Sequence, residues 1–337
     1  MKRFNTITLI SLVALFILYS CGNANKNTKP TGPATDTSTV HVNIPAFNED
    51  SAFYFTKKQC DFGPRVNNTQ AHDKCAVWLI QKMKSFSANV MVQKGQVTAF
   101  NGTSLKIQNI ITSFNPDKPF RILLCSHWDS RPFADEDEDA SKHRTPIDGA
   151  NDGASGVGVL IEIARILNQH KIDVGIDIAF FDAEDYGEPK GDTEHQSDDN
   201  WALGTQYWCK NPHIPNYHAN YGILLDMVGV PNAKFTKEGT SMQYAADVVA
   251  KVWGKAASIN YGNYFVNQQT QAINDDHFSI NHLTGIPTID IIHHDDATPS
   301  GFYKYWHTLQ DNMQNVDKKT LKAVGQTLLT VIFEAPN

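Results

Sequence analysis

The sequence has 337 residues, with 29 basic side chains against 36 acidic ones and a formal net charge of −7. A chain of this sign repels a phosphate backbone, so nucleic acid is excluded as a partner. From residue 43 onward the sequence has no low-complexity segment, no repeat and no apolar stretch of membrane-spanning length. Residues 43–337 are therefore expected to form a single α/β domain.

Residues 1–42 carry the signals of an exported protein. Two basic residues precede the apolar stretch Ile7–Leu18, which is too short for a membrane-spanning helix. The stretch leads to Cys21 in a pattern that resembles a bacterial lipobox, so residues 1–20 are expected to be a lipoprotein signal peptide. Cys21 would then carry the lipid anchor to the bacterial cell envelope, on its periplasmic or its surface-facing side; an ordinary signal peptide is the alternative. Residues 21–42 are polar and are predicted to be a flexible tether.

The remaining chain alternates between predicted helices and predicted strands. Strands are expected where a short run is almost continuously apolar, and helices where apolar residues recur every three or four positions. In chain order these are a helix at Thr69–Phe86, strands at Ile107–Phe114 and Arg121–Ser126, a helix at Gly153–Asn168, strands at Ile176–Phe181 and Tyr221–Met227, a helix at Ser241–Lys255, a strand at Pro287–Ile292 and a helix at Lys319–Phe333. Such alternation is typical of an α/β fold with a mostly parallel central sheet and helices on both faces.

Acidic and histidine side chains follow several of the predicted strands. They are His127 and Asp129, then Asp182, Glu184 and Asp185, then Asp226, and finally His293 and His294. In an open α/β sheet, ligands bind where the carboxyl ends of the strands converge. Carboxylates gathered there would repel one another unless a cation or shared protons held them together. A bound metal ion is the simplest prediction, whereas His293 and His294 are interpreted as solvated loop residues.

Gly149–Gly156 is a glycine-rich bend that leads into a predicted helix. It lacks the GxGxxG order and the GK[ST] ending of phosphate loops, and Asp152 stands where an anion would bind, so nucleotide binding is excluded. Asp152 is either a metal ligand or only the cap of the following helix.

Three other features have two interpretations each. The acidic run Asp135–Asp139 is interpreted as a solvated loop, with a calcium site as the alternative. Cys60 and Cys75 flank a Gly-Pro turn, and a disulfide between them is compatible with an oxidising compartment. Phe302 and the tyrosines that precede Trp306 form either a platform for peptide recognition or local packing.

Short motifs of polar and aromatic residues occur in a fixed order along the chain. They are His127-Trp128-Asp129-Ser130, Gly149-Ala150-Asn151-Asp152, Phe181-Asp182-Ala183-Glu184-Asp185, Leu225-Asp226-Met227-Val228-Gly229, Asp275-Asp276-His277 and Trp306-His307-Thr308. Their order resembles that of the zinc exopeptidase clan, and within it the chain resembles the bacterial, animal-like glutaminyl-peptide cyclotransferases. The resemblance runs from about Phe53 to the last helix and implies a zinc-aminopeptidase-like fold for a catalytic domain.

The resemblance implies a metal site and a separate catalytic acid. Asp152, Asp185 and His307 would be the ligands of one Zn²⁺ per chain, a set that leaves a fourth position open, as in catalytic zinc sites. Glu184 would transfer protons and would point at the substrate instead of the metal.

The resemblance also implies the substrate and the residues around it. Asp226 and Asp275 would form a hydrogen-bonded pair of acids beside Glu184, and Trp306 and Phe302 would contact the substrate. The implied partners are peptides or proteins with an N-terminal glutamine. The α-amine of that glutamine would attack its own side-chain amide, forming pyroglutamate and releasing ammonia.

The chain departs from the animal enzymes at three places. Asp185 replaces the second glutamate of their Glu-Glu pair, and Asp290 replaces a histidine of their Gly-Val-Pro-Val-Leu-His strand. The tryptophan that closely follows their Glu-Glu pair has no counterpart at that offset, because Trp201 lies much further along. These departures affect the expected shape of the pocket wall and not the metal site.

Two other functions are compatible with the same fold. A di-zinc aminopeptidase would bind a second metal through His127 and Asp226 across a bridging Asp152, and Glu184 would activate a water. The sequence retains these residues, so spacing does not exclude it. A catalytically inactive binding module would have a broken ligand set, and no ligand is replaced. A tryptophan next to His127 and another before the ligand histidine make the resemblance to the cyclotransferases the closer one.

Overall fold

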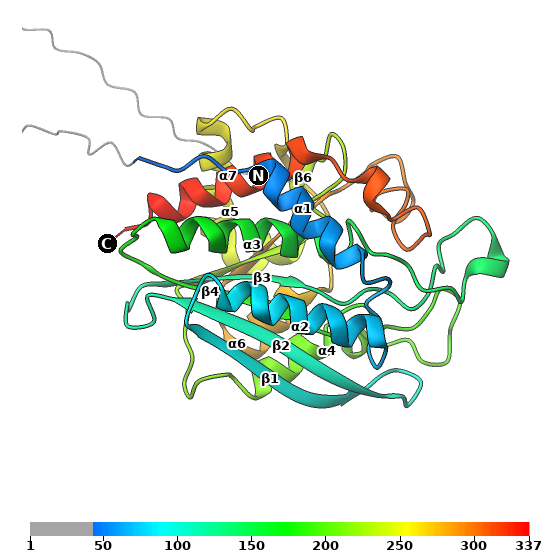
Figure 1. Cartoon of the computed structure of the whole chain (residues 1–337). Coiled ribbons are helices and arrows are strands. Elements are labelled where there is room, and N and C mark those ends of the chain that lie inside the picture. The colour runs from blue at the N-terminus through cyan, green and yellow to red at the C-terminus, as the bar shows by residue number, and fades with distance from the viewer. Residues whose placement is uncertain (1–42, 337) are drawn as a thin grey trace, which may run out of the picture. The chain divides into compact units, whose positions relative to one another are not determined.

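The computed structural model describes residues 43–336 (Figure 1). The signal peptide expected at residues 1–20, the lipid anchor at Cys21 and the tether at 21–42 lie outside the described residues. None of the helices within the described part of the chain combines the length and the apolar character of a membrane span.

A six-stranded sheet lies at the centre of the fold, in the order β1-β2-β4-β3-β5-β8. Its strands are β1 (Asn89–Thr98), β2 (Ser104–Phe114), β3 (Arg121–His127), β4 (Gly175–Phe181), β5 (Tyr221–Asp226) and β8 (Thr288–Ile292). β3 pairs in parallel with β4 and β5, and β5 pairs in parallel with β8. The pairings of β2 with β1 and with β4 are antiparallel. The mostly parallel sheet predicted from the sequence is confirmed, and β3, β4, β5 and β8 all end at the same edge.

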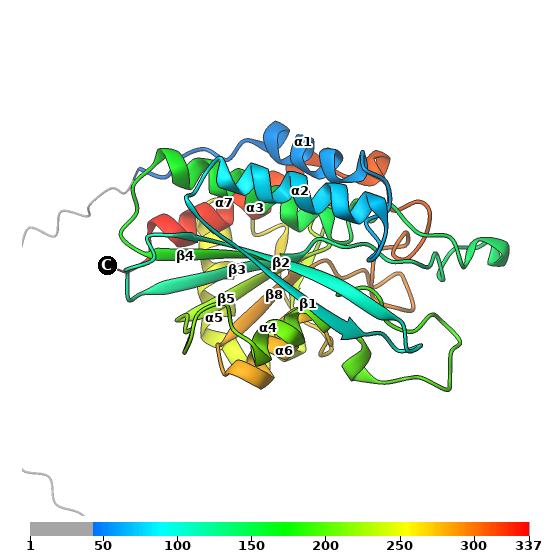
Figure 2. The ribbon, with the colours of Figure 1, turned by 60° about the horizontal axis from the view of Figure 1, so that its bottom comes forward.

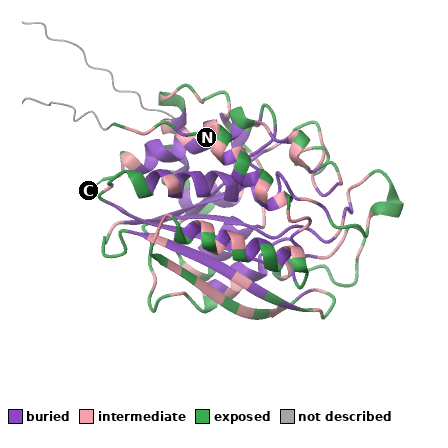
Figure 3. Cartoon of the chain, in the orientation of Figure 1, coloured by how far each residue is buried: buried purple, intermediate pink, exposed green. Residues whose placement is uncertain are grey.

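Strand β1 is the strand of this sheet that the apolar pattern misses. It pairs with β2 over its whole length, from Asn89 opposite Ser113 to Thr98 opposite Ser104. Its residues alternate between exposed and half-buried, as Figure 3 shows along this edge of the sheet. An antiparallel edge strand with one face toward solvent has no continuous apolar run to detect.

Helices cover both faces of the sheet (Figure 2). On one face lie α1 (Glu49–Cys60), α2 (Gln70–Lys84), α3 (Ala154–Gln169) and α7 (Lys318–Phe333), and on the other lie α4 (Leu203–Lys210) and α6 (Asp276–Thr284). Helix α5 (Gly239–Ser258) packs against β8 and α7. The helices predicted from periodicity correspond to α2, α3, α5 and α7, whereas α1, α4 and α6 were not predicted.

The two faces of the sheet are buried by separate groups of apolar side chains. Along β3, Leu124 belongs to the core under α3, whereas Leu123 belongs to the core under α4 and α6. On β4, Phe180 and Phe181 divide in the same way. Because successive side chains of a strand point to opposite faces, a strand buried on both sides appears in the sequence as a continuous apolar run.

Helix α1 lies in close contact with α3. The side chain of Asn48 accepts a hydrogen bond from the N–H of Ser51, which caps the start of α1. A Cβ atom on Gly158 of α3 would lie 2.1 Å from Oγ1 of Thr56 in α1. Glycine at this position therefore allows the two helices to approach over the sheet.

A second, small sheet lies beside the first. It pairs β6 (Phe235–Lys237) in parallel with β7 (Phe265–Gln269). Residues 270–275 connect β7 to α6 and line the cavity described below. Short 3-10 turns occupy Ala140–Lys142, Asp198–Asn200 and Met313–Asn315.

The cysteines of the described chain are free thiols. The disulfide considered between Cys60 and Cys75 is therefore not formed in this structure. Burial raises the pKa of both thiols to about 12, so both stay protonated at neutral pH. Cys75 and Cys125 are fully buried and behave as small hydrophobic side chains, as expected for Cys125.

Candidate active site

A cavity of about 710 Å³ opens at the edge of the sheet where the parallel strands end. The side chains predicted as site residues all line it: Asp152, Glu184, Asp185, Asp226, Asp275, Phe302, Trp306 and His307. These residues come from distant parts of the chain, so the fold brings together the complete set that the sequence motifs singled out.

Asp152, Asp185 and His307 form a compact group of donor atoms. One atom from each lies within 4.8 Å of the others. Nε2 of His307 lies 3.2 Å from Oδ1 of Asp185 and 3.7 Å from Oδ2 of Asp152. All three side chains are buried, and Oδ2 of Asp185 has no hydrogen-bond partner within residues 43–336. Two carboxylates and one imidazole turned toward a common point are a donor set that fits catalytic zinc.

Asp152 is presented by a tight turn at the start of α3. Gly153 has φ +86°, and a Cβ atom there would lie 2.8 Å from the carbonyl oxygen of Asp129. Gly153 itself is the cap residue of α3, and no side chain caps this helix, so the interpretation of Asp152 as a helix cap is wrong. The backbone N–H of Asp152 instead donates to the buried carboxylate of Asp311 at 3.0 Å, and the residue lines the cavity.

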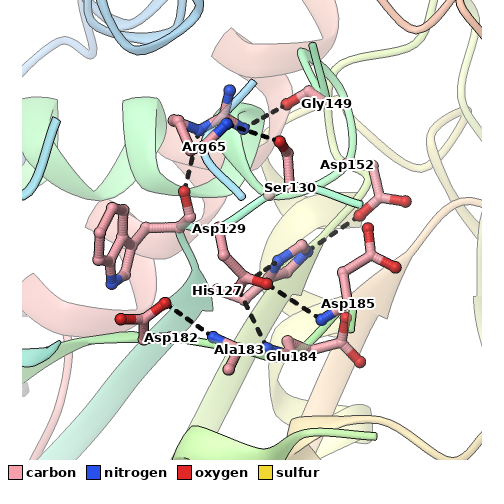
Figure 4. A network of polar contacts seen from close by, with 12 residues as sticks. Arg65, His127, Asp129, Ser130, Gly149, Asp152, Asp182, Ala183, Glu184 and Asp185 are labelled. Atoms are coloured by element: carbon pink, nitrogen blue, oxygen red, sulfur yellow. Dashed lines mark hydrogen bonds and ion pairs between the residues drawn. The ribbon is translucent and has the colours of Figure 1, made fainter. Parts of the chain in front are cut away.

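Arg65 connects the loop after β3 to the turn before α3. Its guanidinium is fully buried and donates to the carbonyl oxygens of Trp128 and Asp148. It also donates to the carbonyl oxygen of Gly149 (Figure 4). Its backbone N–H donates to Oγ of Ser130 at 2.8 Å. A buried guanidinium is costly to leave unpaired, so these bonds fix the relative position of the two loops.

Asp129 holds the loop that follows β4. Its carboxylate oxygens accept hydrogen bonds from the backbone N–H groups of Glu184 and Asp185 at 3.1 and 3.2 Å (Figure 4). Ala183, at the start of this turn, has the left-handed φ of +52°. The turn gives two adjacent acids different surroundings. Asp185 belongs to the metal-binding group, whereas Glu184 lines the cavity outside that group.

His127 lies between two carboxylates. Its Nε2 is 3.0 Å from Oδ1 of Asp152 and 3.2 Å from Oδ1 of Asp226. Burial alone would lower the pKa of His127, but its contacts with Asp129, Asp152 and Asp226 outweigh burial and raise the pKa well above its usual value. One atom from each of His127, Asp152 and Asp226 also lies within 4.8 Å of the others, so the geometry required by the aminopeptidase alternative is present as well.

The acids beside this histidine have raised pKa values. Burial is the largest cause in each case; it raises the pKa of Asp226 to about 8 and that of Glu184 well above the usual range. The hydrogen bond from His127 opposes the rise at Asp226, and the charge of Asp275 adds to it. With a pKa of about 8, Asp226 can hold and release a proton near neutral pH.

Asp226 and Asp275 both line the cavity, and the hydrogen-bonded pair expected of them stays a prediction. Asp226 contacts His127, and Asp275 caps α6. Asp275 also lies close to Asp290 of β8, and one atom from each of these acids and from His277 lies within 4.8 Å of the others. Burial and then the charge of Asp275 raise the pKa of Asp290 well above its usual value. The aspartate that replaces a histidine of the animal enzymes therefore belongs to the acidic side of the site.

Asp135 is not a solvated residue, contrary to the interpretation of Asp135–Asp139. It is 3% exposed and forms an ion pair with Arg131. Its Oδ1 also lies 3.4 Å from Nδ1 of His307. Burial would raise the pKa of Asp135, but Arg131 and His307 outweigh it and hold the pKa well below its usual value. None of the possible metal-binding groups in the described chain includes this run, so the calcium alternative has no support there.

The interpretation of His293 as solvated is also wrong. His293 is buried, and its Nδ1 accepts a hydrogen bond from the backbone N–H of Lys234 at 2.9 Å. Burial lowers its pKa to about 4, so the ring is neutral at neutral pH. His294 lines the cavity and lies 3.0 Å from Asp296.

Comparison with known proteins identifies the family. Residues 109–332 match the model of peptidase family M28. The chain belongs to this family. A solved structure of Tannerella forsythia glutaminyl cyclase is 53% identical, with a TM-score of 0.85 over 87% of this chain and 100% of that one. A leucine aminopeptidase precursor from Bacteroides thetaiotaomicron is 50% identical, with a TM-score of 0.84 over 88% and 100%.

A more distant relative of this M28 protein is the glutaminyl-peptide cyclotransferase of Gloydius blomhoffii. It is 25% identical over 264 residues, which cover 68% of this chain and 66% of that relative. The chain thus spans about two thirds of the length of this curated relative. Together with the bacterial structures, it confirms the resemblance to glutaminyl-peptide cyclotransferases that the motifs indicated.

The cavity wall of this M28 protein is aromatic on both sides of His307. The ring of Trp306 stacks on His307 at 3.7 Å, and Phe302 packs on Trp306 at 4.7 Å between ring centroids. Trp201 lies nearly parallel to the His307 ring at 6.3 Å and also lines the cavity. Trp201 is therefore part of the cavity wall, although it lies much further along the chain than the tryptophan of the animal enzymes.

The position of Trp201 follows from hydrogen bonds at the base of its loop. The backbone N–H of Ala202 donates to the carbonyl of Glu184 at 3.1 Å, and that of Leu203 donates to the carbonyl of Ala183 at 3.0 Å. The chain therefore returns to the metal site after the acidic segment 188–199. Residue spacing holds no signal of this return, which is why the sequence motifs missed Trp201.

Proposed function

We propose that this M28 protein cyclises the N-terminal glutamine of peptides or proteins to pyroglutamate with release of ammonia. The observation that carries the proposal is that one cavity contains a three-residue metal-binding group and a separate buried acid, Glu184, that is not part of that group. The 53% identity to a structure named glutaminyl cyclase supports the same reaction.

Asp152, Asp185 and His307 would hold one zinc ion per chain. Zinc bound there would act as a Lewis acid on the γ-carbonyl oxygen of the substrate glutamine. His127 would remain uncoordinated, as the cation between Asp152 and Asp226.

Glu184 would move the proton that the reaction requires. The α-amine nitrogen forms a bond to the side-chain amide carbon, and the bond from that carbon to the amide nitrogen breaks. Glu184 would accept a proton from the attacking amine and return it to the nitrogen that leaves as ammonia. Its raised pKa, caused first by burial, makes the carboxylate a stronger base than a solvated one.

The remaining cavity residues would orient the substrate and hold protons. Asp226 and Asp275 line the same cavity as Glu184, and burial raises the pKa of each, so they would hold protons close to the reacting amine. Trp306 and Phe302 would pack on the glutamine side chain and keep water away from it.

A di-zinc aminopeptidase is the second candidate, because His127, Asp152 and Asp226 could bind another ion and a related structure is named leucine aminopeptidase precursor. Zinc per chain should be measured by elemental analysis, together with ammonia from a Gln-peptide and leucine from a Leu-anilide. One zinc with ammonia release and no peptide-bond cleavage is the expected result. Two zinc ions per active chain with release of leucine would overturn cyclisation.

We also propose that the protein is exported and anchored to the bacterial cell envelope through a lipid on Cys21. The lipobox-like sequence before Cys21 supports this proposal. In a bacterial host, the wild-type protein should fractionate with membranes, and Cys21→Ser should move it to the soluble fraction. Equal membrane association of both proteins would contradict the anchor.

A further inference from the structure

Arg131 is a fully buried arginine near the metal-binding group. Its Nε and Nη2 donate to the two carboxylate oxygens of Asp135 at 2.8 and 2.7 Å. Both side chains are almost completely excluded from solvent. A bidentate pair in such surroundings has a fixed geometry, because breaking it would leave an uncompensated buried charge.

On one side, this pair holds the loop that carries Asp185. Nη1 of Arg131 donates to the carbonyl oxygen of Asp185 at 3.2 Å and lies 3.4 Å from its Oδ1. The same guanidinium donates to the carbonyl oxygens of Gly187 and Glu188. It also lies over the ring of Trp201, 4.9 Å from the centroid. One cation therefore fixes a proposed zinc ligand and the aromatic wall beside it.

On the other side, Asp135 and the residues after it hold the segment of His307. Oδ1 of Asp135 faces Nδ1 of His307 at 3.4 Å, while Nε2 of the same ring faces the other two ligands. The N–H of Glu136 donates to the carbonyl oxygen of His307 at 3.1 Å. Oδ2 of Asp137 accepts from the N–H of Leu309 at 3.1 Å.

The backbone of His307 needs such support. Its φ of +55° lies in the left-handed region, which is rare for residues other than glycine. Residues in such conformations persist only where the surrounding structure holds them. The contacts with Asp135 and Glu136, and the stacked ring of Trp306, supply that support.

We propose that Arg131 and Asp135 are positioning residues that hold Asp185 and His307 at the separation that zinc requires. The inference rests on the proposed metal site and extends it to two residues that belong neither to the metal-binding group nor to the cavity lining. Residues that orient metal ligands from behind change metal affinity by about 10-fold to 100-fold when they are replaced.

The test is the zinc affinity of the purified full-length protein, measured by competition with a chromophoric chelator. Asp135→Asn should weaken zinc binding by about 10-fold to 100-fold. Its activity should return when free zinc is raised, a recovery that a general folding defect would not show. Glu138→Gln removes an acid from the same run at an exposed position, and it should bind zinc as the wild type does.

Two further variants keep the test decisive. Arg131→Lys retains the charge but loses the fork that spans both oxygens of Asp135, so it should also weaken zinc binding. His307→Ala reports on the metal site itself and should nearly abolish binding. If Asp135→Asn and Arg131→Lys are folded by circular dichroism and bind zinc like Glu138→Gln, the positioning role is overturned. If His307→Ala also binds zinc like the wild type, the proposed metal site is wrong and the positioning role falls with it.

Discussion

Two groups of buried side chains share Asp152, and both meet the same geometric condition for a metal site. The first group adds Asp185 and His307, and the second adds His127 and Asp226; in each, one atom per residue lies within 4.8 Å of the others. Their surroundings differ. The first group is backed by the permanent cation of Arg131. The second lies beside further acids: Asp275, at the start of α6, raises the pKa of Asp226, and Asp290 of β8 lies next to Asp275.

This difference shows that distance alone does not decide which group holds a metal. Metal ligands must be deprotonated, and the buried guanidinium of Arg131 favours the ionised form of Asp185, whereas burial and the charge of Asp152 raise the pKa of this carboxyl group. On the other side, burial and neighbouring acids raise the pKa of Asp226 to about 8, so this carboxyl group holds a proton at neutral pH. The permanent cation beside the first group therefore favours metal binding there, and the proton on Asp226 favours proton transfer at the second.

The largest effect should come from Glu184→Gln, which removes the proposed proton carrier without touching the metal-binding group. We expect kcat to fall by about 10²-fold to 10⁴-fold while zinc stays bound. Zinc content and kcat should be measured on the same preparation. Asp185→Asn is the matched control, because it changes the neighbouring acid and should lose zinc. Loss of zinc from Glu184→Gln would place Glu184 in the metal group and remove the distinction between the two groups.

A smaller effect is expected for His127→Gln. In a one-zinc enzyme the zinc content should stay at the wild-type value, and the rate should fall by about 10-fold to 100-fold, because the cation between Asp152 and Asp226 is lost. Elemental analysis and Gln-peptide kinetics measure the two quantities. A drop in zinc content by half would instead show that the second group binds metal.

Replacement of Trp306 by Ala tests whether the aromatic wall serves the substrate. KM should rise and kcat should fall, together lowering kcat/KM by about fivefold, because an aromatic contact worth roughly 1 kcal/mol positions the glutamine side chain. Zinc content should not change. Unchanged kinetics would mean that the ring only packs on His307, and loss of zinc would assign Trp306 to the support of the metal group.

The smallest effect concerns the pH dependence of stability at Asp290. The pKa of this acid is raised by burial, so the folded state binds its proton more tightly than the unfolded state. The stabilisation of the fold by this proton is fully present below about 3.9, the pKa of an aspartate in the unfolded chain. It is lost as the pH rises toward the pKa of Asp290 in the folded state, by at most about 1.4 kcal/mol per pH unit. The wild type should therefore lose stability relative to Asp290→Asn as the pH rises above about 4.

Urea unfolding of both proteins at several pH values measures this difference. Asp247→Asn, at an exposed position of α5, is the control and should follow the wild type at each pH. A constant difference between wild type and Asp290→Asn across this range would show that Asp290 keeps the same protonation in both states.

The sequence predicted the central part of the fold well for a physical reason. Strands buried on both faces and helices with one apolar stripe have patterns that depend only on local order. The strands from β2 to β8 of the main sheet and the helices α2, α3, α5 and α7 were located in this way. The eight-residue α4 and the edge strand β1 were missed, because neither has a long or continuous apolar pattern.

The candidate site was predictable where its residues directly follow strands. Glu184 and Asp226 were found because parallel strands place their carboxyl ends together. Asp135 and Trp201 were not found, because their positions depend on the path of long loops. Residue spacing also gave no signal that Asp290 lies next to Asp275, at a position where the animal enzymes carry histidine.

The loop between Glu184 and Ala202 is closed at its base by backbone hydrogen bonds. The entropy of closing a loop grows only with the logarithm of its length, so that doubling the length costs about 0.6 kcal/mol. Residues 191–199, beyond the contacts of Glu188 and Lys190 with Arg131 and Asp135, can therefore be lengthened or shortened at little cost in loop-closure entropy while the indole of Trp201 keeps its place beside His307. The position of a wall residue along the chain is thus free to vary among related proteins, although its position in space is not.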